Sequence, residues 1–492
     1  MFLFTFVLSA KSQVNLEWQR SYNYVNSDDI ATDMAVDTVG NVYVTGRSSD
    51  GSYNDFATVK YNSTGQQLWV KRYSSVSSSS NDRARNIDLD TAGNVYVCGS
   101  GKNAKNNNTV IVIKYSPSGD MVWKQSFNTD SIETEDFEID AVLSSDGNMY
   151  VTGYFYDSTS IVHPFLVKYN LDGKKLWSIS DTSHIISVFG SNSITTDING
   201  NVYVSANNQT YTTLLLKYNS EGILQWDVNV SGYLYDLVAD TEGNIYGCGE
   251  KSFYAITIKC NSSGDSIWRK EFRTDSISGQ AQAYSIRIDN ENNIYITGWA
   301  GTDLSTGKDV LLIKYDTLGN EFWNRVYNST NGGYDEGHEL TFDLKNNIYI
   351  VGISNSNFCI NLKYDPEGIL KWVRTINTGV SVTGAGIYVD NSFNVISSAT
   401  IFESGQNRNY LTIKYSQLTD IGFTSGIYPE NYLLEQNYPN PFNPSTNLEF
   451  GIPELGYVSL KVYNASGKEV STLVNEVKQP GNYSVKFNGA NL

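Results

Sequence analysis

The amino-acid sequence predicts an all-β protein: an eight-bladed β-propeller with four-stranded blades, followed by a small immunoglobulin-like β-sandwich. Two observations predict the propeller. A unit of 43 to 54 residues recurs eight times, and each copy is centred on Gly-Asn-Val-Tyr or a variant of it. One strand-like segment that the last copy lacks is found instead ahead of the first copy. Repeats of this period that each hold four short strands are typical of propeller blades.

Each unit contains four strand-like segments and two short turns. In the first unit the segments are TDMAVD, NVYVTG, ATVKY and QLWVKRY, rich in the residue types that favour strands. The turn DTVGN joins the first two segments, and NSTG joins the last two. Asp or Asn at the first position with Gly at the fourth is typical of a type I turn with a left-handed exit into a hairpin. The third segment is apolar on both faces, as expected of a strand between neighbouring blades.

A lysine and a tryptophan mark the third and fourth segments. A Lys follows the core Asn by 15 to 21 residues in every unit, and in seven units a Trp follows nine residues later. Lys414 in the eighth unit has no such Trp, whereas Trp18 precedes the first core in a matching segment. The N-terminal strand is therefore expected to complete the last blade. A sandwich or solenoid would leave this split unit unexplained. The recurrence of Lys and Trp in the blades favours a structural role.

The two ends of the chain differ from the repeats. The apolar run from Phe2 to Leu8 and the Ala-Lys-Ser after it are typical of a signal peptide; a basic start is missing, so the signal is expected to be incomplete. Six of the nine prolines lie between Pro429 and Pro480, where four more strands are expected. The predicted organisation is a signal peptide over residues 1–12, the propeller over 13–416, a linker over 417–430 and a C-terminal domain over 431–492.

Charge and cysteine content narrow the class of protein. The formal net charge of −17 argues against nucleic acid as a partner, because phosphate binding needs a basic surface. No stretch of about 20 apolar residues predicts a transmembrane segment. A monomer is favoured. Four cysteines in predicted strands, without metal-ligand spacing, are interpreted as small unbridged residues: Cys98, Cys248, Cys260 and Cys359.

Both parts of the chain resemble known families. The repeat, with its D-x-x-G-N-x-Y-V-T-G core and the K-Y and W after it, resembles the bacterial beta-propeller repeat family, which implies the fold and little about activity. The C-terminal part resembles the type A sorting domain of the type IX secretion system. The residues that carry this second resemblance are Asn437, Tyr438, Pro439, Asn440, Pro441, Phe442, Asn443 and Pro444.

The second resemblance implies a cellular route. It implies that the type IX secretion machinery is a partner, and that the protein lies outside the cell or on the outer-membrane surface of a Gram-negative, Bacteroidetes-like bacterium. The family continues into one more strand than this sequence holds, so the last strand of the domain is expected to be missing.

The sequence carries no recognisable catalytic motif, and no catalytic residue is predicted. His163, His184 and His338 occupy non-equivalent places in their units, and no nucleophile elbow, metalloprotease helix or phosphate loop occurs. The long, variable connections between blades and between the second and third segments must share one face. Their Ser, Asn, Asp, Gly and Tyr content suits binding of a glycan or a protein.

One alignment on that face suggests a site. Four aspartates each precede their core Asn by twelve residues, at the start of the innermost strand: Asp29, Asp82, Asp136 and Asp335. They predict a cation site, with calcium as a possible ligand, or a site for a cationic ligand. The alternative is that each carboxylate accepts hydrogen bonds from local backbone where the chain enters its blade. No other cofactor is predicted.

The function favoured by these observations is a secreted or cell-surface, non-enzymatic binding or scaffold protein. One alternative is an extracellular glycan lyase or hydrolase with its site at the mouth of the propeller. The other is a purely structural surface component.

Overall fold

The structure, a computed structural model, describes most of the chain in two compact units: Leu16–Tyr415, and Met1–Asn15 together with Ser416–Leu492. Every named element in the described residues is a strand, and no helix there is long and apolar enough to cross a membrane. The described residues are 3–9, 14–75, 81–103, 108–127, 139–186, 193–208, 210–274, 279–301, 307–329, 333–355, 357–377, 379, 383–402, 407–417, 432–440, 444–452, 456–464, 466–478 and 481–489.

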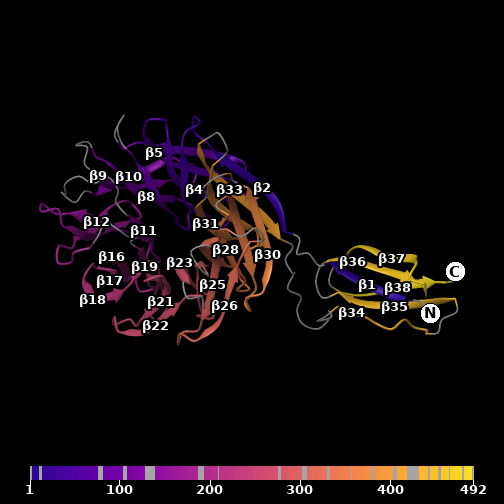
Figure 1. The fold of residues 1–492 in the computed structure, drawn as a ribbon. Helices are drawn as coiled ribbons and strands as arrows, with labels where there is room; N and C mark the ends of the chain where they lie inside the picture. The colour runs from indigo at the N-terminus through magenta and orange to yellow at the C-terminus, as the bar shows by residue number, and fades with distance from the viewer. Residues whose placement is uncertain are drawn as a thin grey trace. The chain divides into compact units, whose positions relative to one another are not determined.

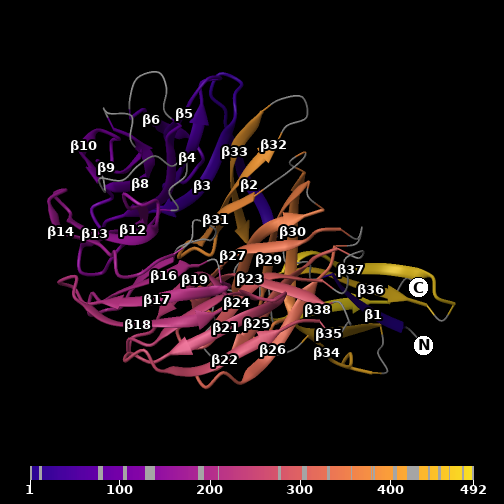
Figure 2. The same ribbon diagram turned by 60° about the vertical axis from the view of Figure 1, so that its left-hand side comes forward.

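The unit Leu16–Tyr415 is an eight-bladed β-propeller, as predicted (Figures 1 and 2). Blades 1 to 7 are antiparallel sheets whose four strands are paired in chain order. The strands of blades 1 to 4 are β3 (Asp29–Val36), β4 (Val42–Ser49), β5 (Asn54–Tyr61), β6 (Gln67–Tyr73); β7 (Arg83–Leu89), β8 (Val95–Lys102), β9 (Asn108–Tyr115), β10 (Met121–Phe127); β11 (Asp140–Leu143), β12 (Asn148–Tyr156), β13 (Val162–Asn170), β14 (Lys175–Ser180); β15 (Ser193–Thr196), β16 (Val202–Asn207), β17 (Thr212–Tyr218) and β18 (Leu224–Ser231). Those of blades 5 to 7 are β19 (Tyr233–Ala239), β20 (Ile245–Lys251), β21 (Tyr254–Cys260), β22 (Ser266–Phe272); β23 (Gln280–Ile288), β24 (Ile294–Gly301), β25 (Asp309–Tyr315), β26 (Glu321–Tyr327); β27 (Glu336–Phe342), β28 (Ile348–Ser354), β29 (Phe358–Tyr364) and β30 (Leu370–Asn377).

Blade 8 is assembled from both ends of the propeller. Its first three strands are β31 (Thr383–Val389), β32 (Val395–Phe402) and β33 (Arg408–Gln417), and its fourth is the N-terminal β2 (Val14–Tyr22). Figure 1 shows the indigo β2 beside the orange β33. The closure predicted from Trp18 is confirmed. The first strands of successive blades contact one another around the centre, and β31 contacts β3.

The short turns have the predicted chemistry. The Asp37 carboxylate accepts hydrogen bonds from the Asn41 backbone N–H (2.8 Å), the Asn41 amide (2.7 Å) and the Tyr43 hydroxyl (3.1 Å). Gly40 at the turn exit has φ = 82°, and Asn292 takes the same conformation (φ = 64°) in a blade whose turn lacks that glycine. Left-handed backbone favours Gly and tolerates Asn.

The recurring lysine and tryptophan join each blade to the next. Lys60 Nζ lies 4.8 Å from the centre of the Tyr43 ring and donates to the Pro117 carbonyl of blade 2 at 2.9 Å. Trp69 Nε1 donates to the same carbonyl at 3.2 Å. We call this shared carbonyl with its two donors the blade latch. It recurs at the carbonyls of Leu171, Ser220, Ser262 and Thr317.

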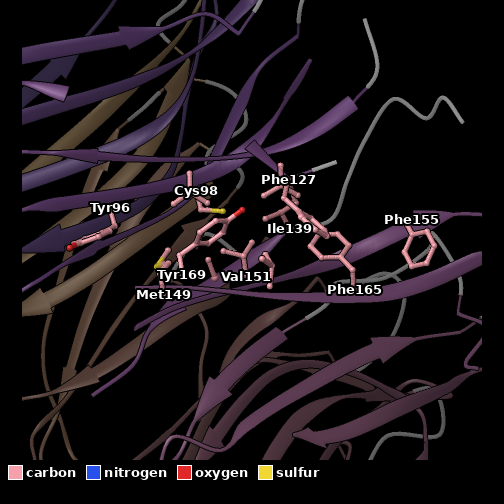
Figure 3. Close-up of a cluster of buried hydrophobic side chains, with 13 residues drawn as sticks. Tyr96, Cys98, Phe127, Ile139, Met149, Val151, Phe155, Phe165 and Tyr169 are labelled. Atoms are coloured by element: carbon pink, nitrogen blue, oxygen red, sulfur yellow. The ribbon is translucent and has the colours of Figure 1, made fainter. Parts of the chain in front are cut away.

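Apolar side chains fill the space between blades. Between blades 2 and 3, Tyr96 and Cys98 pack with Val151 and Phe165 in one buried cluster (Figure 3). The four cysteines are free and buried, as predicted. Burial raises the pKa of the Cys260 thiol to about 11 and that of Cys359 to about 12, so both thiols are protonated at neutral pH.

The second unit consists of two three-stranded sheets around one hydrophobic core. One sheet has the order β34 (Leu433–Leu434), β35 (Ser445–Ile452), β38 (Gly481–Asn488), and the other has the order β1 (Leu3–Ser9), β36 (Gly456–Tyr463), β37 (Glu469–Lys478). Phe450 and Phe487 of the first sheet pack with Leu460 and Val474 of the second. A small C-terminal β domain was expected; the pairing of β1 with β36 was not. The segment predicted as an export signal therefore includes a strand of this unit, and export stays a prediction.

Candidate functional site

The two faces of the propeller differ in the side chains that they expose. The face formed by the connections between blades and between second and third strands is called the mouth face here. Six aromatic side chains of the described propeller are exposed by more than about a third. Phe322 lies on the outer strand β26, and the other five, Tyr24, Tyr53, Tyr211, Phe253 and Tyr334, lie on or beside connections of the mouth face. Exposed aromatic rings are therefore concentrated on this face.

Three of the four aspartates predicted as a site, Asp29, Asp82 and Asp335, lie at the start of the innermost strands and are fully buried. Asp29 accepts from the Tyr24 backbone N–H at 2.7 Å. Asp82 accepts from the Ser75 hydroxyl at 2.6 Å, and Asp335 accepts from the Ser329 backbone N–H at 2.7 Å. Burial raises the pKa of Asp29 to about 6, against the opposing effect of hydrogen bonds from Ser48 and Tyr24.

These contacts match the alternative interpretation, in which each carboxylate caps the chain as it enters a blade. Asp136 lies outside the described residues. Within the described part of the chain, no three His, Cys, Asp or Glu side chains are grouped as ligands of a metal ion would be. Cation binding at these aspartates stays a prediction.

A β-bulge in the innermost strand redirects one side chain in six of the blades. The register of this strand shifts by one residue against the second strand, and a bulge of this kind re-aims the extra residue. The tyrosines at two of these bulges lie with their rings 6.1 Å apart, and the second is 5.9 Å from the ring of the bulge histidine in blade 7. The bulge residues are Thr32, Arg85, Tyr235, Tyr284, His338 and Ala385.

Tyr284 is the centre of a polar network at the mouth face of blades 5 to 7. Its hydroxyl donates to Gln282 Oε1 and accepts from Trp299 Nε1, both at 3.0 Å. The Gln282 amide donates in turn to Glu250. Burial raises the pKa of the Tyr284 hydroxyl above its usual range, and the charges of Glu336 and Glu250 raise it further. The hydroxyl is therefore neutral at physiological pH.

Glu336 completes this network from blade 7. Its carboxylate is 2.6 Å from Lys308 Nζ and 3.4 Å from His338 Nε2. Burial raises the pKa of Glu336, but hydrogen bonds from His338 and Lys308 outweigh burial and leave the pKa below its usual range. Lys308 Nζ also lies 4.2 Å from the centre of the Trp299 ring. One tyrosine thus has a glutamate on either side and a lysine nearby.

Four arginines gather at the mouth face of blades 8, 1 and 2. We call Arg47, Arg83, Arg85 and Arg408 the arginine cluster. The first is near the end of β4 and pairs with β3, the next two are in β7, and Arg408 begins β33. Burial lowers the pKa of the Arg47 guanidinium, and the charges of Arg83, Arg408 and Arg85 lower it further, with Asp28 opposing them.

Within the described residues, Arg47 and Arg85 form no ion pair and no side-chain hydrogen bond, and Nε of Arg85 is buried without a partner. Arg408 is 4.0 Å from Asp28, and both side chains are well exposed. Two guanidinium groups of the arginine cluster, those of Arg47 and Arg85, are therefore without a counter-ion among the described residues of a protein whose net charge is −17.

Around the centre of the propeller, acidic residues alternate with uncharged ones along the ring of innermost strands. The residues eight positions before the core Asn in blades 1, 3, 5 and 7 are acidic. The three aspartates among them each accept a hydrogen bond from a backbone N–H of the next blade. We call the four acidic residues the inner collar: Asp33, Asp140, Asp236 and Glu339. The equivalent residues in blades 2, 4, 6 and 8 are Asn86, Ser193, Ser285 and Gly386. Burial raises the pKa of Asp140 to about 7.

Comparison with known proteins agrees with this architecture. No protein-family model matches the chain. An uncharacterised WD-repeat protein of Acanthamoeba polyphaga mimivirus is 23% identical over 411 residues, which are 62% of this chain and 28% of that protein. The chain thus spans less than a third of that relative's length. Among solved structures, Sqt1 of Chaetomium thermophilum aligns with 83% of this chain and 100% of its own, at 10% identity and a TM-score of 0.51.

The chain is a β-propeller repeat protein. A Bacteroides caccae protein of unknown function also aligns, at 13% identity over 61% of this chain and 94% of its own, with a TM-score of 0.34. At 10% identity, the likeness to Sqt1 indicates the fold alone.

The segment that resembles a sorting motif is anchored to the C-terminal unit. The Asn437 side chain is buried and donates to the Thr446 hydroxyl at 3.0 Å, and that hydroxyl donates to the Pro439 carbonyl at 2.9 Å. Tyr438 between them is 80% exposed. Pro441, Phe442 and Asn443 lie outside the described residues. The described part of the motif therefore has a fixed backbone and one projecting aromatic ring.

Proposed function

We propose that this β-propeller repeat protein is an exported, non-enzymatic binding module whose mouth face holds a glycan or protein ligand. The observation that carries this proposal is the concentration of exposed aromatic rings on that face. Removing aromatic rings from water is favourable, and an exposed ring in a rigid frame can bind a sugar face or an apolar side chain with little loss of freedom. Tyr211 and Tyr233 add a stacked pair whose ring centres are 4.7 Å apart.

Replacing Tyr53 and Tyr211 together by Ala is expected to weaken ligand binding about tenfold or more, because both rings are exposed on the mouth face. The measurement is binding of the full chain to an array of neutral and acidic polysaccharides, followed by titration of the best ligand. Phe322→Ala is the matched control, since this exposed ring lies on an outer strand. Equal losses in the control and the double variant, or no binding of the native protein to any polysaccharide, would contradict a glycan ligand and favour a structural surface component.

The proposal includes export by the type IX secretion machinery, which the motif around Tyr438 supports. Tyr438→Ala is expected to reduce export severalfold without changing the melting temperature, because the ring is 80% exposed. The measurement is the ratio of extracellular to cell-retained protein in a host with this secretion system. Tyr457→Ala, at an exposed tyrosine of β36 in the same unit, is the control. Unchanged export of the Tyr438 variant would count against recognition through this residue.

A second candidate function, a glycan lyase or hydrolase, is favoured by the network around Tyr284. A tyrosine with a glutamate on either side offers groups that can hold and move protons. Release of new reducing ends or unsaturated products from a polysaccharide, lost in Tyr284→Phe, would support the enzyme. Binding without any product supports the binding module.

A further inference from the structure

We propose that the arginine cluster binds the carboxylate groups of an acidic polysaccharide at the mouth face. This inference rests on the proposed function and names the class of ligand. It starts from a contrast of charge: the chain carries 52 acidic and 35 basic Lys and Arg residues. Nevertheless, four arginines lie on neighbouring strands of blades 8, 1 and 2: Arg47 near the end of β4, Arg83 and Arg85 in the first half of β7, and Arg408 at the start of β33.

The arrangement is electrostatically unfavourable in the free protein. Arg47 is partly buried among three other guanidinium groups, and neither it nor Arg85 has an ion-pair partner among the described residues. Like charges that are withdrawn from water raise each other's free energy. An anion placed among these groups removes that repulsion and supplies the missing hydrogen-bond acceptors, including one for the buried Nε of Arg85.

The chemistry favours a carboxylate carried on a sugar. A guanidinium group presents parallel N–H donors that match the two oxygens of a planar carboxylate. Tyr53 is exposed on the connection from β4 to β5. Tyr24, on the connection from β2 to β3, has the Arg72 guanidinium 3.7 Å from the centre of its ring. Aromatic rings beside guanidinium groups fit a chain of sugar rings with regularly spaced carboxylates. The net charge of −17 disfavours a nucleic acid as the ligand.

The test compares polysaccharides that differ in charge. The full chain is titrated with polygalacturonate, dextran sulfate, neutral dextran and poly-glutamate, each at about 50 and 300 mM NaCl. We expect polygalacturonate to bind best and to weaken at high salt, since exposed charges are screened. Replacing Arg47 and Arg85 together by Gln is expected to weaken polygalacturonate binding about tenfold or more. The melting temperature should not fall, because the variant also removes repulsion between like charges.

Arg269→Gln is the matched control, because Arg269 lies on the outer strand β22 and is paired with Glu271 at 2.8 Å. Binding of neutral dextran as tight as that of polygalacturonate would overturn the arginine proposal and leave the proposed function standing. Unchanged polygalacturonate binding in the double variant would also overturn it. Preference for dextran sulfate, lost in the double variant, would replace the carboxylate by a sulfate. Preference for poly-glutamate would replace the glycan by an acidic protein, and no binding to any polysaccharide would remove the glycan function as well.

Discussion

Trp18→Ala is expected to destabilise the propeller by about 3–5 kcal/mol, the range for deleting a buried tryptophan, and to lower its melting temperature by several degrees. Trp18 is 7% exposed and packs 6.1 Å from the Tyr61 ring of blade 1. Its Nε1 donates to the Ser63 carbonyl at 3.1 Å, the same carbonyl that Lys414 reaches at 3.3 Å. This is the blade latch at the closure, where β2 is held in blade 8 by non-covalent contacts to β33.

The effect of Trp18→Ala should exceed that of an equivalent change within the ring. Trp226 makes the same latch between blades 4 and 5, but its strand β18 is joined by a short turn to β17 of its own blade, whereas β2 has no such turn to its neighbour β33. Calorimetric melting of the Trp18→Ala and Trp226→Ala variants makes the comparison, with Leu16→Ala, at a residue 52% exposed on β2, as the control. If Trp18→Ala lowered the melting temperature no more than Leu16→Ala does, β2 would not be needed to close the ring.

Arg287→Met is expected to destabilise the propeller by about 2–3 kcal/mol at pH 8. Arg287 Nη1 is 2.6 Å from Asp236, and Nη2 is 3.0 Å from Glu339, so one guanidinium links two members of the inner collar. Removing one partner of a fully buried ion pair costs about 3–5 kcal/mol. The expected cost is smaller here because 35% of the Arg287 side chain is exposed and solvent screens the remaining charges.

The loss should shrink as the pH falls. Burial already raises the pKa of Glu339 above its usual range, while Arg287 lowers it; removing Arg287 raises it further. A carboxyl whose folded pKa exceeds its unfolded value contributes stability below the unfolded pKa, about 4.3, and loses it as pH rises through the folded pKa. When melting temperatures are measured between pH 5 and pH 8, the value for Arg287→Met should therefore approach that of the native protein at pH 5. Arg269→Gln should show no such convergence, and a deficit independent of pH in Arg287→Met would contradict this explanation.

Much of the frame was accessible from the sequence because its residues recur. The turn residues Asp37 and Gly40, the lysines and the tryptophans occupy one place in successive blades, and recurrence identifies architecture. The displaced Trp18 indicated the closure. The hydrogen-bond partners of these tryptophans and lysines were not predicted. They are backbone carbonyls of the next blade, and any residue type can supply a backbone carbonyl, so the sequence does not reveal them.

The candidate site was largely missed for the opposite reason. Arg85, Tyr284 and His338 occupy equivalent bulges but are chemically different residues, so alignment by residue type does not reveal them. Their clustering with Arg47 or Glu336 depends on contacts between blades. The aspartates that did align, such as Asp82, accept hydrogen bonds from nearby loop residues. Residues that recur at the start of a strand more often stabilise the fold than bind a ligand.

The inner collar has a consequence for how the number of blades can change. Acidic and neutral residues alternate around it, and each of its three aspartates accepts a hydrogen bond from a backbone N–H of a neighbouring blade whose own equivalent residue is uncharged. Such a pattern closes without mismatch only in a ring with an even number of members. Loss of blade 8 would place Glu339 in the blade next to that of Asp33, which brings two like charges together at the centre of the ring. Gain or loss of blades in this architecture is therefore expected to proceed in pairs, with parity conserved.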